Sequence, residues 1–356
     1  MARIVNDLGC DITIIGRRRG TCCNNQIVPY RIKRFRMLFK KGFLFYKCFN
    51  LRLFFYLILN RSDVLVANDL DTLLPNFLVS RIKKLPLVYD SHEYFTGVPE
   101  LQSRPFVRWV WKSIESRIFP KLQYVVTVSD SIAELYEREY KFKPVVVRNC
   151  SQMPKHLESF SREDLEVPED HLMVILQGTG INVDRGGEEL IEAVGMTGNV
   201  SLLVVGTGDA IEKMKAMSHN IYPAGRVRFI PVVPWELMIK YTRAADVGVT
   251  LDKDTNINYR FSLPNKLFDY IAAGIPVIAS DLKEVEKIIV ENHCGIIISS
   301  VTPENISQAF TRLHNNRPEL DEMKKNAKIA SAYLNWENES KLVIELYSEV
   351  LQSIHI

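Results

Sequence analysis

Arg185 and Gly186 are suited, by residue type and by position, to bind an anion. They stand between a predicted strand, 172–178, and a predicted helix, 186–195. Backbone N–H groups at the N-terminus of a helix attract anions, and a guanidinium beside them adds aligned donors, which suits a diphosphate. Taken alone, an arginine at such a turn is better explained as a solvated surface residue.

A second group of polar residues begins the helix predicted over 263–273. Asn265 and Lys266 lie in its first turn, and Asp269 follows one turn later on the face of Asn265. A lysine can neutralise a phosphate, and a carboxylate can accept hydrogen bonds from two ribose hydroxyls. Because Lys266 and Arg185 both begin helices after strands of one predicted sheet, the two helix starts together predict a site for a nucleoside diphosphate.

His92 and Asp69 are the candidate reactive residues of the N-terminal half. His92 directly follows the predicted strand 87–91, and Asp69 directly follows the predicted strand 63–68. Ligands of parallel α/β sheets lie beyond the carboxyl ends of the strands. We therefore predict that His92 takes part in the chemistry, although an isolated histidine can be structural. Asp69 either contacts a substrate or caps the helix that follows it.

The elements that must position these residues alternate between strand and helix, which predicts an α/β protein with two doubly wound parallel sheets. We predict an N-terminal domain over 1–150, a linker over 151–170, a second domain over 171–334 and a closing helix over 335–356 that could return to the first domain. The predicted strands are 11–16, 63–68, 87–91, 124–129 and 145–149, then 172–178, 201–206, 227–233, 246–251, 276–280 and 295–299.

The chain begins with a short helical pattern ahead of the strand at 11–16. A doubly wound domain usually has a strand before that helix. Either the first strand is missing or the domain simply begins with a helix. Two such domains would face each other across a cleft.

Composition excludes several classes of protein. A chain of 356 residues with 47% hydrophobic and 24% charged residues is globular, and is neither disordered nor a polytopic membrane protein. Its six cysteines show no CxxC spacing, which predicts a reducing cytoplasm. Neither glycine pair, at 178–180 or 206–208, continues to the third glycine of a dinucleotide fingerprint, so a nicotinamide site is disfavoured.

Basic residues are concentrated near the N-terminus, where residues 12–62 contain twelve Lys and Arg and no Asp or Glu. Residues 31–61 interleave nine of these cations with many aromatic residues. The longest apolar stretch, 53–59, is too short to span a bilayer. A basic and aromatic helix suits the surface of an anionic membrane. The alternative is a helix that packs on its own sheet with solvated lysines; we disfavour nucleic-acid binding because no recognition module is present.

The chain resembles a family 4 (group 1) glycosyltransferase of the GT-B fold. The resemblance rests on VANDLDTLLP, PLVYDSHEYF, VVTVSDSI, VVVRN, the QG(x)6RG stretch, LPNKLFDYIAAGIPVIASDL and the glycine of HCGIII, which follow the family's order over nearly the whole chain. Two positions depart from the family pattern. Phe261 stands at the first acidic position of its E(x)7E motif, and Thr179 stands where an arginine is common.

The resemblance implies roles for the residues that match. His92 corresponds to a histidine near the sugar and reaction centre, Arg185 to a basic residue that holds the diphosphate, and Asp269 to the second acidic position, which meets the ribose. Lys266 of the PNK variant would supply the missing cation, and Asp69 would lie on the acceptor side.

Together these observations predict a retaining glycosyltransferase, with a nucleotide sugar of the UDP or GDP type as its donor. Its acceptor would be a saccharide or lipid-linked saccharide of surface polysaccharide synthesis. We expect no metal or other cofactor, no nucleic-acid partner, and a cytoplasmic protein that can lie on the membrane. The alternatives are a GT-B nucleotide-sugar epimerase and a non-catalytic scaffold that binds nucleotide sugar or membrane.

Overall fold

The computed structural model describes residues 1–18, 28–152, 158–221 and 224–354. These residues form two compact units. Unit 1 comprises Met1–Arg148 and Glu339–Ile356, and unit 2 comprises Asn149–Asn338. The helix that ends the chain therefore belongs to the first unit. In the described residues, no helix combines the length and apolar character needed to cross a membrane.

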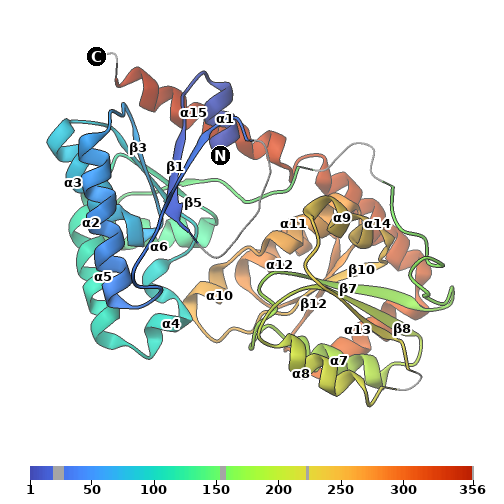
Figure 1. Ribbon diagram of the computed structural model, residues 1–356. Coiled ribbons are helices and arrows are strands. Elements are labelled where there is room, and N and C mark those ends of the chain that lie inside the picture. The colour runs from blue at the N-terminus through green and yellow to red at the C-terminus, as the bar shows by residue number, and fades with distance from the viewer. Residues whose placement is uncertain (19–27, 153–157, 222–223, 355–356) are drawn as a thin grey trace. The chain divides into compact units, whose positions relative to one another are not determined.

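Unit 1 contains a four-stranded parallel sheet in the order β3-β4-β5-β6, together with a two-stranded parallel sheet of β1 and β2 (Figure 1). Its strands are β1 (Thr13–Arg17), β2 (Arg31–Phe35), β3 (Leu65–Asn68), β4 (Leu87–Ser91), β5 (Tyr124–Thr127) and β6 (Val145–Val146). Its helices are α1 (Ala2–Asp7), α2 (Phe43–Leu59), α3 (Leu70–Lys83), α4 (Pro99–Gln102), α5 (Pro105–Ile118), α6 (Asp130–Tyr140) and most of α15 (Trp336–Gln352), with 3-10 turns η1 (Phe95–Gly97) and η2 (Phe119–Lys121).

Unit 2 contains a six-stranded parallel sheet in the order β12-β11-β10-β7-β8-β9. Its strands are β7 (Leu172–Gly178), β8 (Val200–Gly206), β9 (Val227–Ile230), β10 (Val247–Thr250), β11 (Val277–Ser280) and β12 (Gly295–Ile298). Its helices are α7 (Gly187–Met196), α8 (Ile211–Ser218), α9 (Trp235–Ala244), α10 (Ile257–Phe261), α11 (Asn265–Ala273), α12 (Lys283–Asn292), α13 (Pro303–Asn315) and α14 (Arg317–Ser331).

The core of unit 2 lies on both faces of this sheet. Alternate residues of β7 enter different clusters: Met173 and Ile175 pack with α11, whereas Val174 and Leu176 pack with α7 and α13. Side chains of a strand alternate between faces, so a strand covered on both sides must be apolar throughout. This explains why the sequence of β7 reads as a continuous apolar run.

The direction of the chain through the sheet reverses between β7 and β10. From β7 the chain moves outward through β8 and β9, then returns to β10 on the other side of β7 and continues to β11 and β12. Such a switch point leaves a crevice beyond the carboxyl ends of the two central strands, because the connections leave them in opposite directions. The residues that follow β7 and β10 are therefore the ones placed to meet a ligand.

Glycine permits the loops after β7 and β8 to approach closely. Gly206 has a φ of +139°, and a Cβ on it would lie 1.8 Å from the carbonyl oxygen of Gly178. A Cβ on Gly208 would lie 2.0 Å from the carbonyl oxygen of Ile181. The GTG of residues 206–208 is thus a packing requirement of this edge of the sheet.

Two predictions from the sequence need correction, and one helix was not predicted. Residues 31–35 form the strand β2, so only the part from Phe43 to Leu59 of the basic segment is helical. The predicted linker 151–170 is partly folded into unit 2, because Leu165 and Val167 are buried in its core; residues 153–157 of that segment lie outside the described residues. The short helix α10 was not predicted, because its five residues show no apolar period.

Candidate functional site

Arg185 lies in the loop between β7 and α7, at the carboxyl edge of the unit 2 sheet. Its Nε is 3.8 Å from Oδ1 of Asp252, and its guanidinium carbon is 5.1 Å from the centre of the Tyr259 ring. Burial would lower the pKa of Arg185, but Asp252 and Tyr259 outweigh it and the pKa is raised. The guanidinium is therefore charged and is held between a carboxylate and an aromatic face.

Asp252 follows β10, the strand beside β7 at the switch point. Its side chain is only 3% exposed. Within the described residues, Asp252 Oδ1 and Arg185 Nε each have no hydrogen-bond partner, although both atoms are buried. A buried ion pair that leaves polar atoms unpaired is costly, which is typical of a site that expects a ligand.

Lys266, the second residue of α11, lies near the same carboxylate. Burial lowers the pKa of its ammonium group, the attraction of Asp252 opposes this change, and the repulsion from Arg185 adds to it. Across the part of the chain that the structure describes, no hydrogen bond or ion pair engages this ammonium. Lys266 and Arg185 therefore both lie in the electrostatic field of the Asp252 carboxylate, and Asp209 also acts on Arg185.

Asp269 lies one turn further along α11 and is 5% exposed. Its carboxylate accepts hydrogen bonds from the Ser151 hydroxyl and from Nε2 of Gln177, the latter at 2.9 Å. Burial raises the pKa of Asp269, and hydrogen bonds from Ser151, Gln177 and Trp235 partly offset this rise. Asp269 therefore belongs to a buried polar network, and it connects α11 to the end of β7.

Asn265 and Gly186 occupy the two helix starts. Asn265 is exposed, and its Oδ1 accepts a hydrogen bond from Nδ2 of Asn149 at 3.0 Å. Gly186 precedes α7 with a φ of +70°, and a Cβ on it would lie 2.5 Å from Cβ of Leu251. The glycine is required for the close approach of the β7–α7 and β10 loops, whether or not a ligand meets its backbone.

His92 lies in unit 1 directly after β4 and is held by two aspartates. Its backbone N–H donates to Oδ1 of Asp69 at 3.0 Å, and its ring Nδ1 lies 3.3 Å from Oδ2 of the same carboxylate. Its Nε2 lies 3.4 Å from Oδ2 of Asp90. The hydrogen bond with Asp69 is the main cause that raises the pKa of His92 to about 9. The imidazole is therefore a cation at neutral pH.

Asp69 occupies the N-cap position of α3, but its side chain makes no capping hydrogen bond to that helix. Its φ of 57° directs the backbone into the left-handed region, which is unfavourable for most residues. The carboxylate binds His92 instead. The carboxylate of Asp69 therefore holds His92 and does not cap α3.

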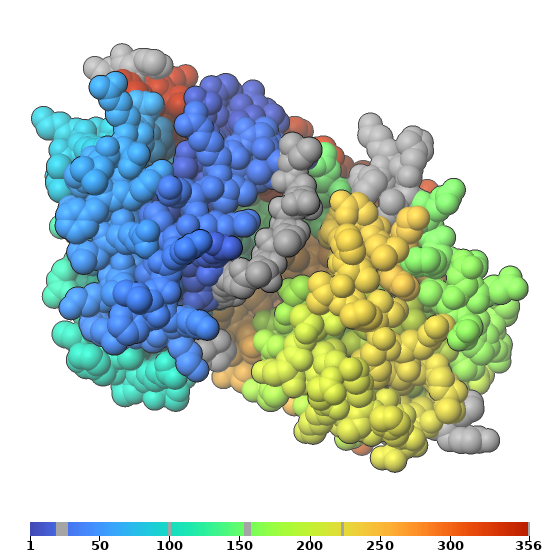
Figure 2. Space-filling view, in the orientation of Figure 1, coloured from blue at the N-terminus to red at the C-terminus, as the bar shows by residue number. Residues whose placement is uncertain are grey.

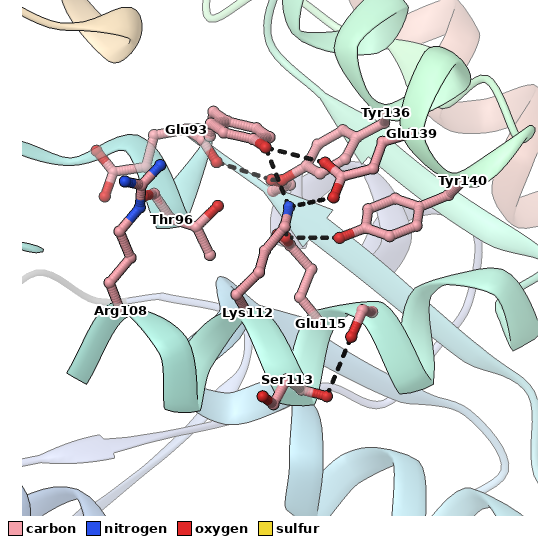
Figure 3. A network of polar contacts seen from close by, with 12 residues as sticks. Glu93, Thr96, Arg108, Lys112, Ser113, Glu115, Tyr136, Glu139 and Tyr140 are labelled. Atoms are coloured by element: carbon pink, nitrogen blue, oxygen red, sulfur yellow. Dashed lines mark hydrogen bonds and ion pairs between the residues drawn. The ribbon is translucent and has the colours of Figure 1, made fainter. Parts of the chain in front are cut away.

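A network of polar contacts, in which Glu115 is the buried member, fixes the loop that follows His92 (Figure 3). Lys112 of α5 lies 2.8 Å from Glu115 Oε2, 2.5 Å from Glu139 Oε1 and 3.1 Å from the Tyr94 hydroxyl. Tyr140 donates to Glu115 Oε2 at 2.8 Å, and Tyr94 donates to Glu139 Oε2 at 2.9 Å. The network ties α5 and α6 to the loop after β4, and so it limits the movement of the backbone beside His92.

Sequence reasoning missed Asp252, Tyr259 and Gln177. Asp252 directly follows a predicted strand, so the argument that identified His92 would also have identified Asp252. Gln177 is the one polar residue within an apolar strand, which is a signal of a buried hydrogen-bond network. Tyr259 gave no signal in the sequence, because the short helix α10 that carries it was not predicted. Among the described residues, no group of three or more His, Cys, Asp or Glu side chains could hold a metal ion.

Comparison with known proteins places the chain in a family. The profile of the glycosyl transferases group 1 matches residues 159–330, and that of Glycosyltransferase Family 4 matches residues 1–150. The chain belongs to this family: it is a group 1, family 4 glycosyltransferase. An uncharacterised glycosyltransferase of Methanocaldococcus jannaschii is 22% identical over 289 residues, which are 77% of this chain and 71% of the relative.

Solved structures share the fold. Sucrose-phosphate synthase from Thermosynechococcus elongatus superposes with a TM-score of 0.79 at 17% identity, over 98% of this chain and 91% of that chain. HepE of Anabaena, solved in complex with UDP and glucose, superposes with a TM-score of 0.70 at 16% identity, over 90% of this chain and 86% of that chain. The fold is therefore GT-B, as the sequence predicted.

Proposed function

We propose that this glycosyltransferase moves a sugar from a nucleoside diphosphate sugar to a saccharide or lipid-linked saccharide, with retention of the anomeric configuration. Surface polysaccharide synthesis is the setting that we propose. The UDP and glucose bound by the Anabaena relative favour a UDP-sugar as the first donor to test. Retention, acceptor class and cytoplasmic location rest on the family resemblance.

The convergence of Arg185 and Lys266 carries this proposal. Arg185 pairs with the buried carboxylate of Asp252, and Lys266, which has no ion-pair partner among the described residues, lies near enough to feel both groups at the switch point of the sheet, beside the N-terminus of α7. A diphosphate supplies the missing negative charge and hydrogen-bond acceptors for both side chains. Because negative charge on the diphosphate grows as the glycosidic bond breaks, cations fixed there stabilise the transition state more than the bound donor.

The remaining residues receive roles around this diphosphate. We assign Asp269 and Asn265 to the nucleoside and the backbone at Gly186 to the phosphates. We assign His92 to the reaction centre, where its charged imidazole can stabilise negative charge. Asp69, which holds His92, lies on the acceptor side in this proposal.

The test measures both binding and turnover in Arg185→Ala and Lys266→Ala. Hydrogen bonds to charged groups contribute about 1.5–3 kcal/mol, so each substitution should lower kcat/KM roughly tenfold to a hundredfold. Lys215→Ala is the matched control, because Lys215 pairs with Glu212 on the surface of α8. Calorimetric binding of UDP and GDP that is unchanged in both cation variants, with the fold intact, would contradict the proposal.

A donor panel distinguishes the alternatives. The wild-type protein is incubated with UDP- and GDP-sugars and a membrane extract, and products are identified by mass spectrometry. A transferase gives a glycosylated acceptor and free nucleoside diphosphate. An epimerase changes the sugar nucleotide without any acceptor, and a scaffold binds the nucleotide without turnover.

A further inference from the structure

Helices α2, α3 and α5 of unit 1 form one layer, in which α3 packs against both α2 and α5 (Figure 1). The rings of Tyr46 on α2 and Trp111 on α5 also meet, with centroids 5.4 Å apart. We call the outward side of this layer the three-helix face. Figure 2 shows α2 at the surface of unit 1.

The outer side of α2 is apolar where a soluble helix is normally polar. Its inner side is formed by four buried residues spaced four apart, Phe45, Phe49, Leu53 and Leu57. Its outer side carries Leu44, Leu51 and Phe55, whose exposed fractions are 49%, 56% and 53%. A surface helix normally turns a polar face to solvent, so the large apolar residues on the outer side of α2 call for a second apolar environment.

The neighbouring helices extend this apolar surface. On α3 Ile82 is 62% exposed, and on α5 Phe106 and Trp109 are 73% and 62% exposed. The rings of Phe106 and Trp109 stack with centroids 6.0 Å apart. Large exposed apolar side chains on three adjacent helices indicate an interaction surface rather than isolated exceptions.

The charges of the three-helix face have one sign. Its exposed cations include Lys47 on α2, Arg81 on α3, and Arg108 and Arg117 on α5. The acidic residues of these helices are Asp71 and Glu115, and neither is exposed. The exposed positions of all three helices therefore combine cations with apolar side chains and carry no anion.

We propose that the three-helix face docks on the surface of an anionic lipid bilayer. Aromatic and aliphatic side chains enter the region between headgroups and acyl chains, while the cations remain with the anionic headgroups. A second copy of this chain is disfavoured because two faces with only positive charge would repel each other. Nucleic acid offers charge complementarity but no apolar environment for Leu51, Phe55 and Ile82.

The structure changes the surface that the sequence suggested. The sequence located membrane contact in residues 31–61, but the apolar surface extends to α3 and α5, and residues 31–35 form β2. This proposal goes beyond the proposed function, because it does not depend on the donor or on catalysis.

Vesicle co-sedimentation of the full chain tests the proposal. The vesicles contain either phosphatidylcholine alone or an equal mixture with phosphatidylglycerol. A cation near an anionic surface strengthens binding about fivefold, so Lys47→Ser/Arg81→Ser/Arg117→Ser should weaken binding roughly a hundredfold. The matched control, Lys213→Ser/Lys325→Ser/Lys328→Ser, removes the same charge from exposed helix positions of unit 2 and should bind as the wild type does.

Tryptophan fluorescence reports the orientation of the bound protein. Trp109 is one of four tryptophans and is exposed, so its emission should shift to the blue when anionic vesicles are added. Trp109→Phe should remove this shift. Equal binding to both kinds of vesicle, or equal loss in the two triple variants, would overturn the proposal. So would a concentration-dependent dimer that the unit 1 triple variant dissociates in the absence of lipid.

Discussion

Asp252→Asn gives the most informative perturbation of the proposed donor site, because the carboxylate of Asp252 attracts both Arg185 and Lys266. At 3.8 Å, a charge pair near a protein surface interacts by about 4 kcal/mol with an effective dielectric constant of 20. Breaking a buried pair from one side costs about 3–5 kcal/mol. We therefore expect the unliganded protein to lose about 3 kcal/mol of stability, which lowers Tm by about 6–12 °C.

The same substitution should strengthen nucleoside diphosphate binding. Without Asp252, Arg185 and Lys266 repel each other until an anion arrives, and the cation–π contact with Tyr259 still holds Arg185. We expect UDP to bind about tenfold more tightly at pH 6.5, a difference of about 1.4 kcal/mol. The gain should shrink as pH rises, because loss of Asp252 lowers the pKa of Lys266 further and its ammonium then loses its proton.

Scanning calorimetry with and without UDP, followed by titration calorimetry, measures both effects. Asp254→Asn is the matched control, because Asp254 pairs with Arg260 at the surface only two residues away. An equal loss of Tm in the two variants would show that the Asp252 pair does not stabilise the fold. UDP affinity that stays the same or falls in Asp252→Asn would show that Asp252 does not compete with the diphosphate for the two cations.

Three further predictions concern single side chains. Asp269→Ala should weaken UDP binding, measured by titration calorimetry, more than it lowers kcat. Asp269→Asn can keep the hydrogen bond from Ser151 and should preserve the fold. Burial raises the pKa of Asp71 to about 6, so ionisation of this carboxyl lowers the stability of the protein as pH rises from about 4 to 6. Asp71→Asn should therefore raise the free energy of unfolding by up to about 3 kcal/mol at pH 8 but little at pH 4. The pKa of His92 is raised from its ordinary value of 6.5 to about 9. The hydrogen bond between the charged imidazole and Asp69 therefore stabilises the fold fully below pH 6.5, and this contribution is lost as pH rises through 9. Asp69→Asn should lower that pKa in an NMR titration and shift the alkaline limb of kcat to lower pH; an unchanged His92 titration would contradict the contact.

The alternation of apolar strands and amphipathic helices was enough to predict the four-stranded sheet of unit 1 and nearly every element of unit 2, but not the separate two-stranded sheet of β1 and β2. Local signals suffice for this level because a parallel strand covered on both faces must be apolar throughout, as β7 shows. The same signals failed for α10, whose five residues are too short for an apolar period, and for residues 31–35, where strand and helix patterns are hard to separate.

The candidate residues at the strand ends could be found from the sequence alone, because the rule that ligands lie beyond the carboxyl ends of parallel strands needs only the order of elements. It identified Arg185, Lys266 and His92 on that basis. The pairing of Arg185 with Asp252, and the position of Lys266 near the same carboxylate, depend on the three-dimensional fold, since the strand order places β10 beside β7 although β8 and β9 come between them in the chain. The charge environment of His92 was likewise decided in three dimensions, because its two carboxylate neighbours depend on the pairing of β3 with β4.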